Sequence, residues 1–255
     1  MKLNALRMKK GKAKIIMLTA YDCQMAKILD ETGIDLILVG DSLGMVIQGF
    51  KNTKSVTVAD MLYHTRAVAR GATNTPIVGD MPIKSDRTAR DALRNAQRFI
   101  KAGAQGVKIE GTRSKVVRTL LNAGIPVMGH VGLLPQTAEN YRVKGKRPPE
   151  AEKIFHDALE LDELGVFSMV LECIPEALAK RITEAVRTPT IGIGAGRYCD
   201  GQVLVINDML GFDESFAPKY LKRFASLNKI IKDAIAKFQE EVSSVVYPDS
   251  DHTYH

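Results

Sequence analysis

The sequence predicts an α/β fold, a (β/α)8 TIM barrel in a single domain with extra C-terminal helices. Eight short β-rich apolar runs alternate with helical patterns along 255 residues, which favours a closed barrel over a doubly wound sheet. Acidic residues also come at or just past the ends of four of these runs. The chemistry of a parallel barrel gathers at the carboxyl ends of its strands, so four acids in equivalent places argue for one shared pocket.

The elements are expected in regular alternation. The strands are residues 14–19, 35–40, 75–79, 106–110, 125–129, 166–172, 188–193 and 202–206. Helices are expected at 22–32, 58–70, 86–102, 114–123 and 150–164, and a glycine directly follows each of them. Such a glycine commonly ends a helix in the left-handed conformation. Asp22 is expected to cap the first of these helices, and Pro175 to open another after the sixth strand.

The remaining segments are ends and loops. Residues 1–13 form an N-terminal segment, 42–57 a longer loop at the barrel mouth, 218–243 one or two helices, and 244–255 a loose tail. Residues 1–255 together are expected to form one domain, because this length suits one closed barrel.

Composition indicates a cytoplasmic protein that acts on small molecules. No apolar stretch approaches the roughly 20 residues that cross a membrane, and the basic segment up to Lys14 lacks the apolar core of a secretory signal. Cys23, Cys173 and Cys199 form no C-x-x-C pair, which suits reduced thiols, and buried packing is favoured over reactivity for Cys173. The net charge of +7 permits an anionic partner, but its spread among acids speaks against nucleic acid.

Asp41 and Asp80 follow the second and third apolar runs at equivalent places. Hard cations such as Mg²⁺ take one or two carboxylates from a protein and leave the other positions to water or substrate. Each acid alone would as readily cap a helix or turn. With Glu110 at the end of the next run, the pattern favours a metal site made by Asp41, Asp80 and Glu110.

Three further residues are candidates for the same pocket. Lys108 shares a strand face with Glu110, and a lysine inside a barrel needs an anion such as a substrate carboxylate or a developing oxyanion. Glu172 stands apart from the metal group, where partial burial would suit a base, although a salt bridge across the mouth is the alternative. His130 either faces this pocket or hydrogen-bonds a loop. A role for Asp208, near the eighth strand, is left open.

These segments together resemble the ketopantoate hydroxymethyltransferase family, also called 3-methyl-2-oxobutanoate hydroxymethyltransferase. The resemblance is carried by residues 17–22 (MLTAYD), 39–46 (VGDSLGMV), 79–82 (GDMP), 107–111 (VKIEG), 129–133 (GHVGL), 171–173 (LEC) and 191–196 (IGIGAG). It runs from about Gly11 to Tyr220. Seven motifs in order make coincidence implausible.

The resemblance implies a (β/α)8 transferase of pantothenate biosynthesis, a homodecamer, with Mg²⁺ as cofactor and 5,10-methylenetetrahydrofolate as co-substrate. Carried over by residue, Asp41 and Asp80 would ligate Mg²⁺, with Glu110 completing the metal surroundings. Asp41, Asp80, Ser42 and Lys108 would bind the 2-oxo acid, and Glu172 would be the catalytic base. The chain departs from the family at residues 83–86, where a Phe and a Ser-Tyr pair are usual, and at Leu134, where Thr is common. These departures bear on loop contacts and substrate fit.

The resulting hypothesis is hydroxymethyl transfer to 3-methyl-2-oxobutanoate, giving 2-dehydropantoate, through an enolate that Mg²⁺ and Lys108 stabilise after Glu172 removes the C3 proton. One alternative is a metal-dependent 2-oxo acid lyase of the phosphoenolpyruvate mutase and isocitrate lyase type, which would use the same acids without folate. The other is a barrel that only binds anions. The retained acids and Glu172 speak against it.

Overall fold

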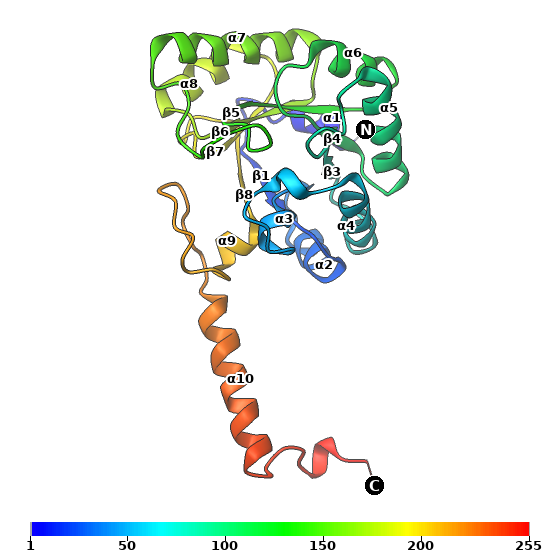
Figure 1. Ribbon diagram of the computed structural model, residues 1–255, viewed down its shortest axis with the longest axis vertical. Coiled ribbons are helices and arrows are strands. Elements are labelled where there is room, and N and C mark those ends of the chain that lie inside the picture. The colour runs from blue at the N-terminus through cyan, green and yellow to red at the C-terminus, as the bar shows by residue number, and fades with distance from the viewer. Residues whose placement is uncertain (1, 255) are drawn as a thin grey trace. The chain divides into compact units, whose positions relative to one another are not determined.

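The computed structural model describes residues 2–254 and contains the expected barrel. Its eight strands are parallel and close in the order β1-β2-β3-β4-β5-β6-β7-β8, with β1 paired to both β2 and β8. Figure 1 shows helices of the first unit, such as α2, α4, α5, α6, α7 and α8, on the outside of these strands. The predicted α/β class and (β/α)8 topology are confirmed.

The bounds of the elements agree closely with the expected ones. The strands are β1 (Ile15–Thr19), β2 (Leu36–Val39), β3 (Ile77–Asp80), β4 (Gly106–Lys108), β5 (Val127–Gly132), β6 (Ser168–Glu172), β7 (Thr190–Ile193) and β8 (Gly201–Leu204). The helices are α1 (Lys2–Arg7), α2 (Cys23–Thr32), α3 (Leu43–Val46), α4 (Val58–Gly71), α5 (Ala89–Lys101), α6 (Ser114–Asn122), α7 (Pro148–Leu164), α8 (Glu176–Ala185), α9 (Ile206–Leu210) and α10 (Leu227–Ser243). Two 3-10 turns, η1 (Thr53–Ser55) and η2 (Ser250–His252), complete the set.

The interior of the barrel is filled by apolar side chains from the strands, and α1 adds to them. Met17, Leu38 and Met128 belong to this buried cluster, and so do Leu3 and Leu6 of α1. A Cβ on Gly106, the first residue of β4, would lie 3.0 Å from Leu3. Helix α1 therefore covers the amino-terminal end of the barrel, which leaves the carboxyl end open for chemistry. The sequence pattern did not indicate this helix.

The glycines expected to end helices divide into two kinds. Gly33, Gly103, Gly124 and Gly165 have φ values between 71° and 109°, as predicted. The prediction for Gly71 is wrong, because Gly71 is the last residue of α4 and is not among the glycines of positive φ. A Cβ there would lie 2.2 Å from the carbonyl oxygen of Cys23, so Gly71 allows α4 to approach α2 closely. Close packing, rather than a turn, explains this glycine.

Other boundaries also differ from the expected ones for local reasons. Helix α5 begins at Ala89 rather than at residue 86, because the Thr88 side chain caps it by accepting from Asp91 N. Asp22 caps α2 in the same way, as predicted. The loop at 42–57 contains the short helix α3 and the turn η1. No helix among residues 2–254 is long and apolar enough to cross a membrane.

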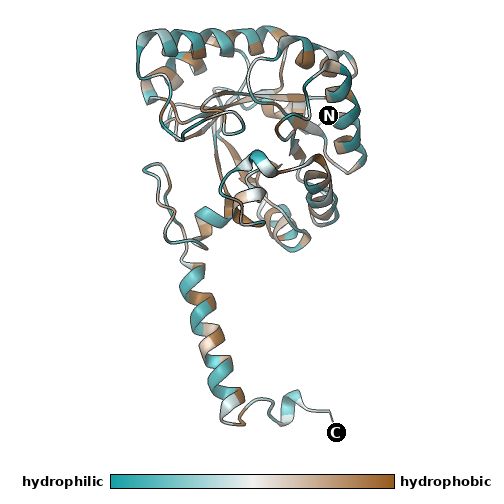
Figure 2. Ribbon diagram, viewed as in Figure 1, coloured by the Kyte–Doolittle hydropathy of each residue, from teal (hydrophilic) through white to brown (hydrophobic). Residues whose placement is uncertain are grey.

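The chain forms two compact units, one up to Val205 and one from Ile206. The second unit holds α9, an irregular stretch and α10, so helix begins at Leu227 and not at residue 218 as expected. Helix α10 buries none of its residues. Its apolar residues recur along the helix, where the ribbon of Figure 2 is brown. The grouping of residues 1–255 into one domain stays a prediction.

The side chain of Asp162 joins the end of α7 to the turn before β7. Its Oδ1 accepts hydrogen bonds from the backbone N–H groups of Arg187 and Thr188, at 3.1 and 2.8 Å, and from the Thr188 hydroxyl at 2.7 Å. Burial alone would raise the pKa of this carboxyl. The hydrogen bonds outweigh burial and hold the pKa below its ordinary value.

We expect Asp162→Ala to lower the free energy of unfolding by about 3 kcal/mol, because the buried Thr188 N–H loses its acceptor. Its exposed neighbour Glu163 is the matched control, and Glu163→Ala should change stability by less than about 0.5 kcal/mol. The pKa of Asp162 is lower in the folded protein than in the unfolded chain, so its carboxylate stabilises the fold at pH values above the unfolded pKa. This stabilisation is lost as the pH falls through the folded pKa. The effect of Asp162→Ala should therefore shrink below about pH 4. Urea unfolding at pH 7 and pH 3 measures this. Equal losses in both variants would contradict the role of Asp162.

Candidate active site

The ion pair between Lys108 and Asp80 lies at the centre of the candidate site. The two residues are register partners on β4 and β3, and Lys108 Nζ donates to Asp80 Oδ2 at 2.6 Å. Their side chains are only 6% and 2% exposed. The pairing follows from the fold, because neighbouring parallel strands bring equivalent positions side by side.

Asp41 joins this pair from the end of β2. Its backbone N–H donates to Asp80 Oδ2 at 3.4 Å, and its own Oδ2 accepts from Gln136 Nε2 at 2.9 Å. Ser42 follows at the start of the mouth loop, with its Oγ 2.9 Å from the Tyr21 hydroxyl. A Cβ on Gly40 would lie 2.8 Å from Ser42 Oγ, so the glycine before Asp41 makes room for this serine.

Glu110 lies at the end of β4 and is held from a neighbouring loop. Its Oε2 accepts the backbone N–H of Gln136 at 3.2 Å. The Gln136 side chain also donates to the carbonyl of Met81 at 2.9 Å. One glutamine therefore ties the loops after β2, β3, β4 and β5 together around the acids.

His130 connects Glu110 with Glu172. Its Nε2 lies 3.2 Å from Glu172 Oε2 and its Nδ1 lies 3.8 Å from Glu110 Oε1, although neither nitrogen is aligned for a hydrogen bond. The histidine ring is buried, whereas the Glu172 side chain is 18% exposed. His130 thus faces the acids rather than a loop. Glu172 stands at the edge of the cluster, where a substrate can reach it.

The residue after Glu172 has an unusual backbone conformation. Cys173 has a φ of 47°, a left-handed value that side chains rarely adopt. Its N–H donates to Ile193 O and its carbonyl accepts from Lys144 N, both at 2.8 Å. These bonds hold the strained turn that directs Glu172. Burial, aided by Glu172, raises the pKa of the half-buried Cys173 thiol to about 12, which fits the expectation that it is not a nucleophile.

The site carries more buried negative charge than Lys108 balances. Burial would lower the pKa of Lys108, but Asp80, Asp41 and Glu110 together raise it, so this lysine is a stable cation. Burial also raises the pKa of Asp41, and the neighbouring charge of Asp80 raises it further. The pKa of Glu110 is raised mainly by burial. Such a cluster favours a second cation.

Two buried oxygens support this conclusion. Asp80 Oδ1 and Glu110 Oε1 have no hydrogen-bond partner among the described residues. Within residues 2–254, no three His, Cys, Asp or Glu side chains gather tightly enough to hold a metal ion by themselves. Mg²⁺ commonly uses only one or two carboxylates together with water or substrate. The residues present therefore fit a magnesium ion that shares its coordination with a ligand.

The structure also places two residues at the site that the sequence reasoning did not single out. One of them is Gln136, in the loop after β5. Tyr141 belongs to the same loop and is 52% exposed, and its pKa is raised by burial and then by the charges of Asp41, Glu110 and Glu172. Both residues lie in a loop, where no strand or helix period reveals which side chains turn inward.

The loop that departs from the family pattern is fixed by its own contacts. Lys84 has a φ of 67°, and the carbonyl of Ser85 accepts from the buried Asn95 side chain at 2.7 Å. Arg113, after β4, pairs with Asp86 at 3.4 Å. The departure at residues 83–86 is therefore a structured connection at the rim.

Comparison with known proteins identifies the family. A model of the ketopantoate hydroxymethyltransferase family matches residues 1–250. The chain belongs to this family. A 3-methyl-2-oxobutanoate hydroxymethyltransferase of Syntrophus aciditrophicus (strain SB) is 50% identical over 254 residues, which are 97% of this chain and 93% of the relative. One from Clostridium botulinum (strain Langeland / NCTC 10281 / Type F) is 51% identical, covering 94% and 90%. The expectation of an enzyme of this transferase family is confirmed.

Solved structures share the fold at low sequence identity. Phosphonopyruvate hydrolase in complex with oxalate and Mg²⁺ matches with a TM-score of 0.64 and 11% identity, over 98% of this chain and 93% of that one. A 2,3-dimethylmalate lyase of the phosphoenolpyruvate mutase/isocitrate lyase superfamily gives 0.62 and 12%, over 99% and 92%. These similarities show a shared barrel fold only. The evidence on activity comes from the family.

Gln136 gives a test of how the site is held. We expect Gln136→Ala to lower transferase activity ~10- to 100-fold, as is usual when a residue that orients a metal-binding carboxylate is removed. The exposed Gln97 of α5 is the matched control, and Gln97→Ala should keep full activity. Initial rates with thermal unfolding as a check on folding measure the difference. Unchanged activity in Gln136→Ala would show that Asp41 is positioned without it.

Proposed function

We propose that the protein transfers a hydroxymethyl group from 5,10-methylenetetrahydrofolate to 3-methyl-2-oxobutanoate, giving 2-dehydropantoate. The observation that carries this proposal is the division of the site into a buried acid cluster around Lys108 and a partly exposed Glu172 beside it. The cluster suits the charged end of a 2-oxo acid together with a cation, and Glu172 suits proton removal. The names of the relatives supply the substrate.

Mg²⁺ is the cofactor in this proposal, held by Asp41 and Asp80 with Glu110 completing its surroundings. The two unpartnered oxygens of Asp80 and Glu110 support it, as does the magnesium complex of phosphonopyruvate hydrolase, which has the same fold. When bound, the ion would withdraw electrons from the 2-oxo acid and so make its C3 hydrogen more acidic.

The remaining steps of the proposed reaction are assigned to residues of this chain. Glu172 takes the proton from C3, and the electron pair left on the substrate forms an enolate. Lys108 places its positive charge where the enolate oxygen develops negative charge. Ser42 contacts the 2-oxo acid, and Gln136 holds Asp41 and Glu110 in place. Water adds to the methylene carbon of the folate, both C–N bonds of that carbon break, and tetrahydrofolate leaves the carbon behind as an aldehyde. C3 attacks the aldehyde carbon, and the aldehyde oxygen takes up a proton to become the hydroxyl group.

Glu172→Gln separates proton removal from binding, because it keeps the shape of the side chain and removes the base. With Mg²⁺ present, the native protein should exchange the C3 hydrogen of 3-methyl-2-oxobutanoate with deuterated water without folate. The variant should bind this acid and exchange it ~100-fold or more slowly. NMR follows both events.

The control for this experiment is the native protein in the presence of EDTA, which should also stop exchange if the proposed ion is required. Folate-dependent formation of 2-dehydropantoate by the native protein tests the whole proposal. Normal exchange by a folded Glu172→Gln protein would assign the base to another group, and His130 would be the next to test.

Self-association into a homodecamer in the cytoplasm completes the proposal. Helix α10 supports it with one apolar stripe of Ile230, Ile231, Ile235, Phe238 and Val242, each between 40% and 58% exposed. Exposed apolar stripes of this size commonly mark protein interfaces.

Ile235→Asp combined with Phe238→Asp is expected to reduce the oligomer mass measured by light scattering, because charges would enter the apolar stripe. Lys232→Asp, an exposed position of the same helix, is the matched control and should keep the native mass. A native protein that is already monomeric at micromolar concentration would overturn the homodecamer.

A further inference from the structure

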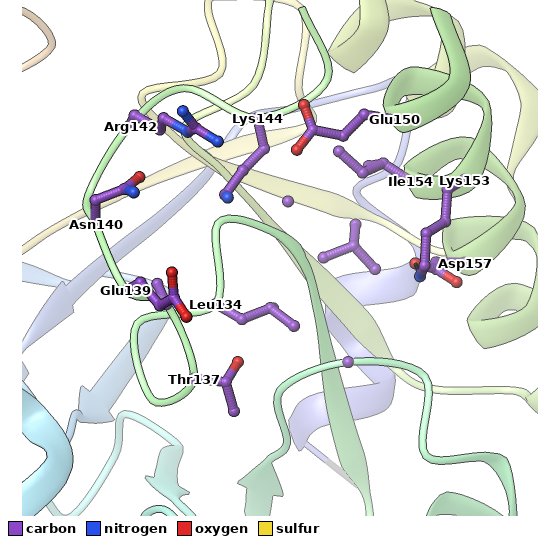
Figure 3. A pocket seen from close by; sticks show the side chains of 14 residues that line it. Leu134, Thr137, Glu139, Asn140, Arg142, Lys144, Glu150, Lys153, Ile154 and Asp157 are labelled. Carbon is purple, nitrogen blue, oxygen red and sulfur yellow. Dashed lines mark hydrogen bonds and ion pairs between the residues drawn. The ribbon is translucent and has the colours of Figure 1, made fainter. Parts of the chain in front are cut away.

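A pocket of about 420 Å³ lies at the carboxyl end of the barrel beside the acid cluster. Three parts of the chain line it: the ends of β4 and β5, the loop at residues 133–147, and the first turns of α7. Figure 3 shows side chains from the loop and from α7 turned toward the same space. The proposed roles of the acids do not use this pocket.

The pocket shares its walls with the candidate active site. Gly111, which lines it, directly follows Glu110, and Gly132, which also lines it, is the register partner of Glu172. The loop is fastened to the cluster at Gln136 and to the turn after Glu172 through Lys144 N. A molecule in this pocket would therefore have one edge beside Glu172.

The lining combines an apolar surface with available cations. Val131, Leu134 and Ile154 offer an apolar wall that suits a flat ring. Arg142 and Lys144 extend from the loop toward the pocket in Figure 3.

Two of the three acids of the lining are engaged elsewhere, and the third, Glu139, is exposed to solvent. Glu150 accepts from Gly145 N at 2.7 Å, and Asp157 pairs with Lys153 at 2.6 Å. In the described chain, the side chains of Arg142 and Lys144 have no hydrogen-bond or ion-pair partner at all. Two cations above an apolar wall suit a ligand with an aromatic body and carboxylates.

We propose that this pocket binds the folate donor, with its aromatic part on Leu134 and Ile154 and its glutamate carboxylates at Arg142 and Lys144. The inference rests on the proposed function and adds to it the place of the second substrate. The volume is typical of pockets for ligands of this size, whereas a five-carbon 2-oxo acid would leave most of it empty. The position beside Glu172 brings the donor next to the carbon from which the proton is removed.

Variants of the two cations test the assignment. Lys144→Ala and Arg142→Ala should each raise the KM for 5,10-methylenetetrahydrofolate ~10-fold, the effect expected for loss of one charge-assisted contact. Deuterium exchange at C3 of 3-methyl-2-oxobutanoate, which needs no folate, should stay at the native rate and also reports that the variants are folded. Lys144→Arg should restore most of the donor KM, because it restores the charge.

Lys146→Ala is the matched control, since Lys146 is an exposed lysine of the same loop that does not line the pocket. Its donor KM should equal the native value. An active native enzyme whose donor KM is unchanged in Lys144→Ala and Arg142→Ala would overturn the assignment of the pocket. If Lys144→Ala and Arg142→Ala lost both C3 exchange and hydroxymethyl transfer, the assignment would also be overturned, because these side chains would then act on the 2-oxo acid. A native protein with exchange but no folate-dependent product would instead overturn the proposed function.

Discussion

Lys108 and the three carboxylates around it, Asp41, Asp80 and Glu110, form the interaction on which the architecture of the site depends. A lysine buried to this degree is stable as a cation only because acids surround it, and burial together with the neighbouring negative charges raises the pKa values of Asp41 and Glu110. The barrel holds these four groups together because they lie at the ends of three neighbouring strands, β2, β3 and β4. Helix α1 closes the opposite end of the barrel, so the charged end alone is open to ligands.

The loop at residues 133–147 divides the mouth of the barrel into two environments. On one side, Gln136 binds Asp41 and Glu110, where oxygens and charges dominate. On the other side, Leu134 and Ile154 line a pocket with free cations. The proposed reaction between a small, highly charged acid and a larger aromatic donor needs both environments next to each other. One short loop supplies the boundary between them, and the strained turn at Cys173 places Glu172 at that boundary.

The sequence predicted the fold and most of the cluster because both follow from regular periods. Parallel strands of similar length place their last residues at one edge, so Asp41, Asp80 and Glu110 had to meet once eight strands were recognised. Gln136 and Tyr141 could not be found in this way, since the path of a loop depends on contacts that its own sequence does not show. Gly71 was misassigned for a related reason. A glycine after a helical pattern is consistent with a turn or with close packing, and only the position of Cys23 decides between them.

The contrast between His130 and Glu172 explains why we propose Glu172, at the edge of the cluster, as the base. His130 is buried between two carboxylates, so a proton transferred to it would have no direct path to solvent or substrate. Glu172 is close to the same charges but partly exposed, and it can therefore accept a proton from a bound acid and later release it. His130 Nε2 lies 3.2 Å from Glu172 Oε2, so the histidine is a neighbour of the proposed base. The side chains of Lys108 and Asp80 at the centre of the cluster are almost fully buried, whereas that of Glu172 is partly exposed. This difference in burial separates the charged centre from the edge where we propose that proton transfer takes place.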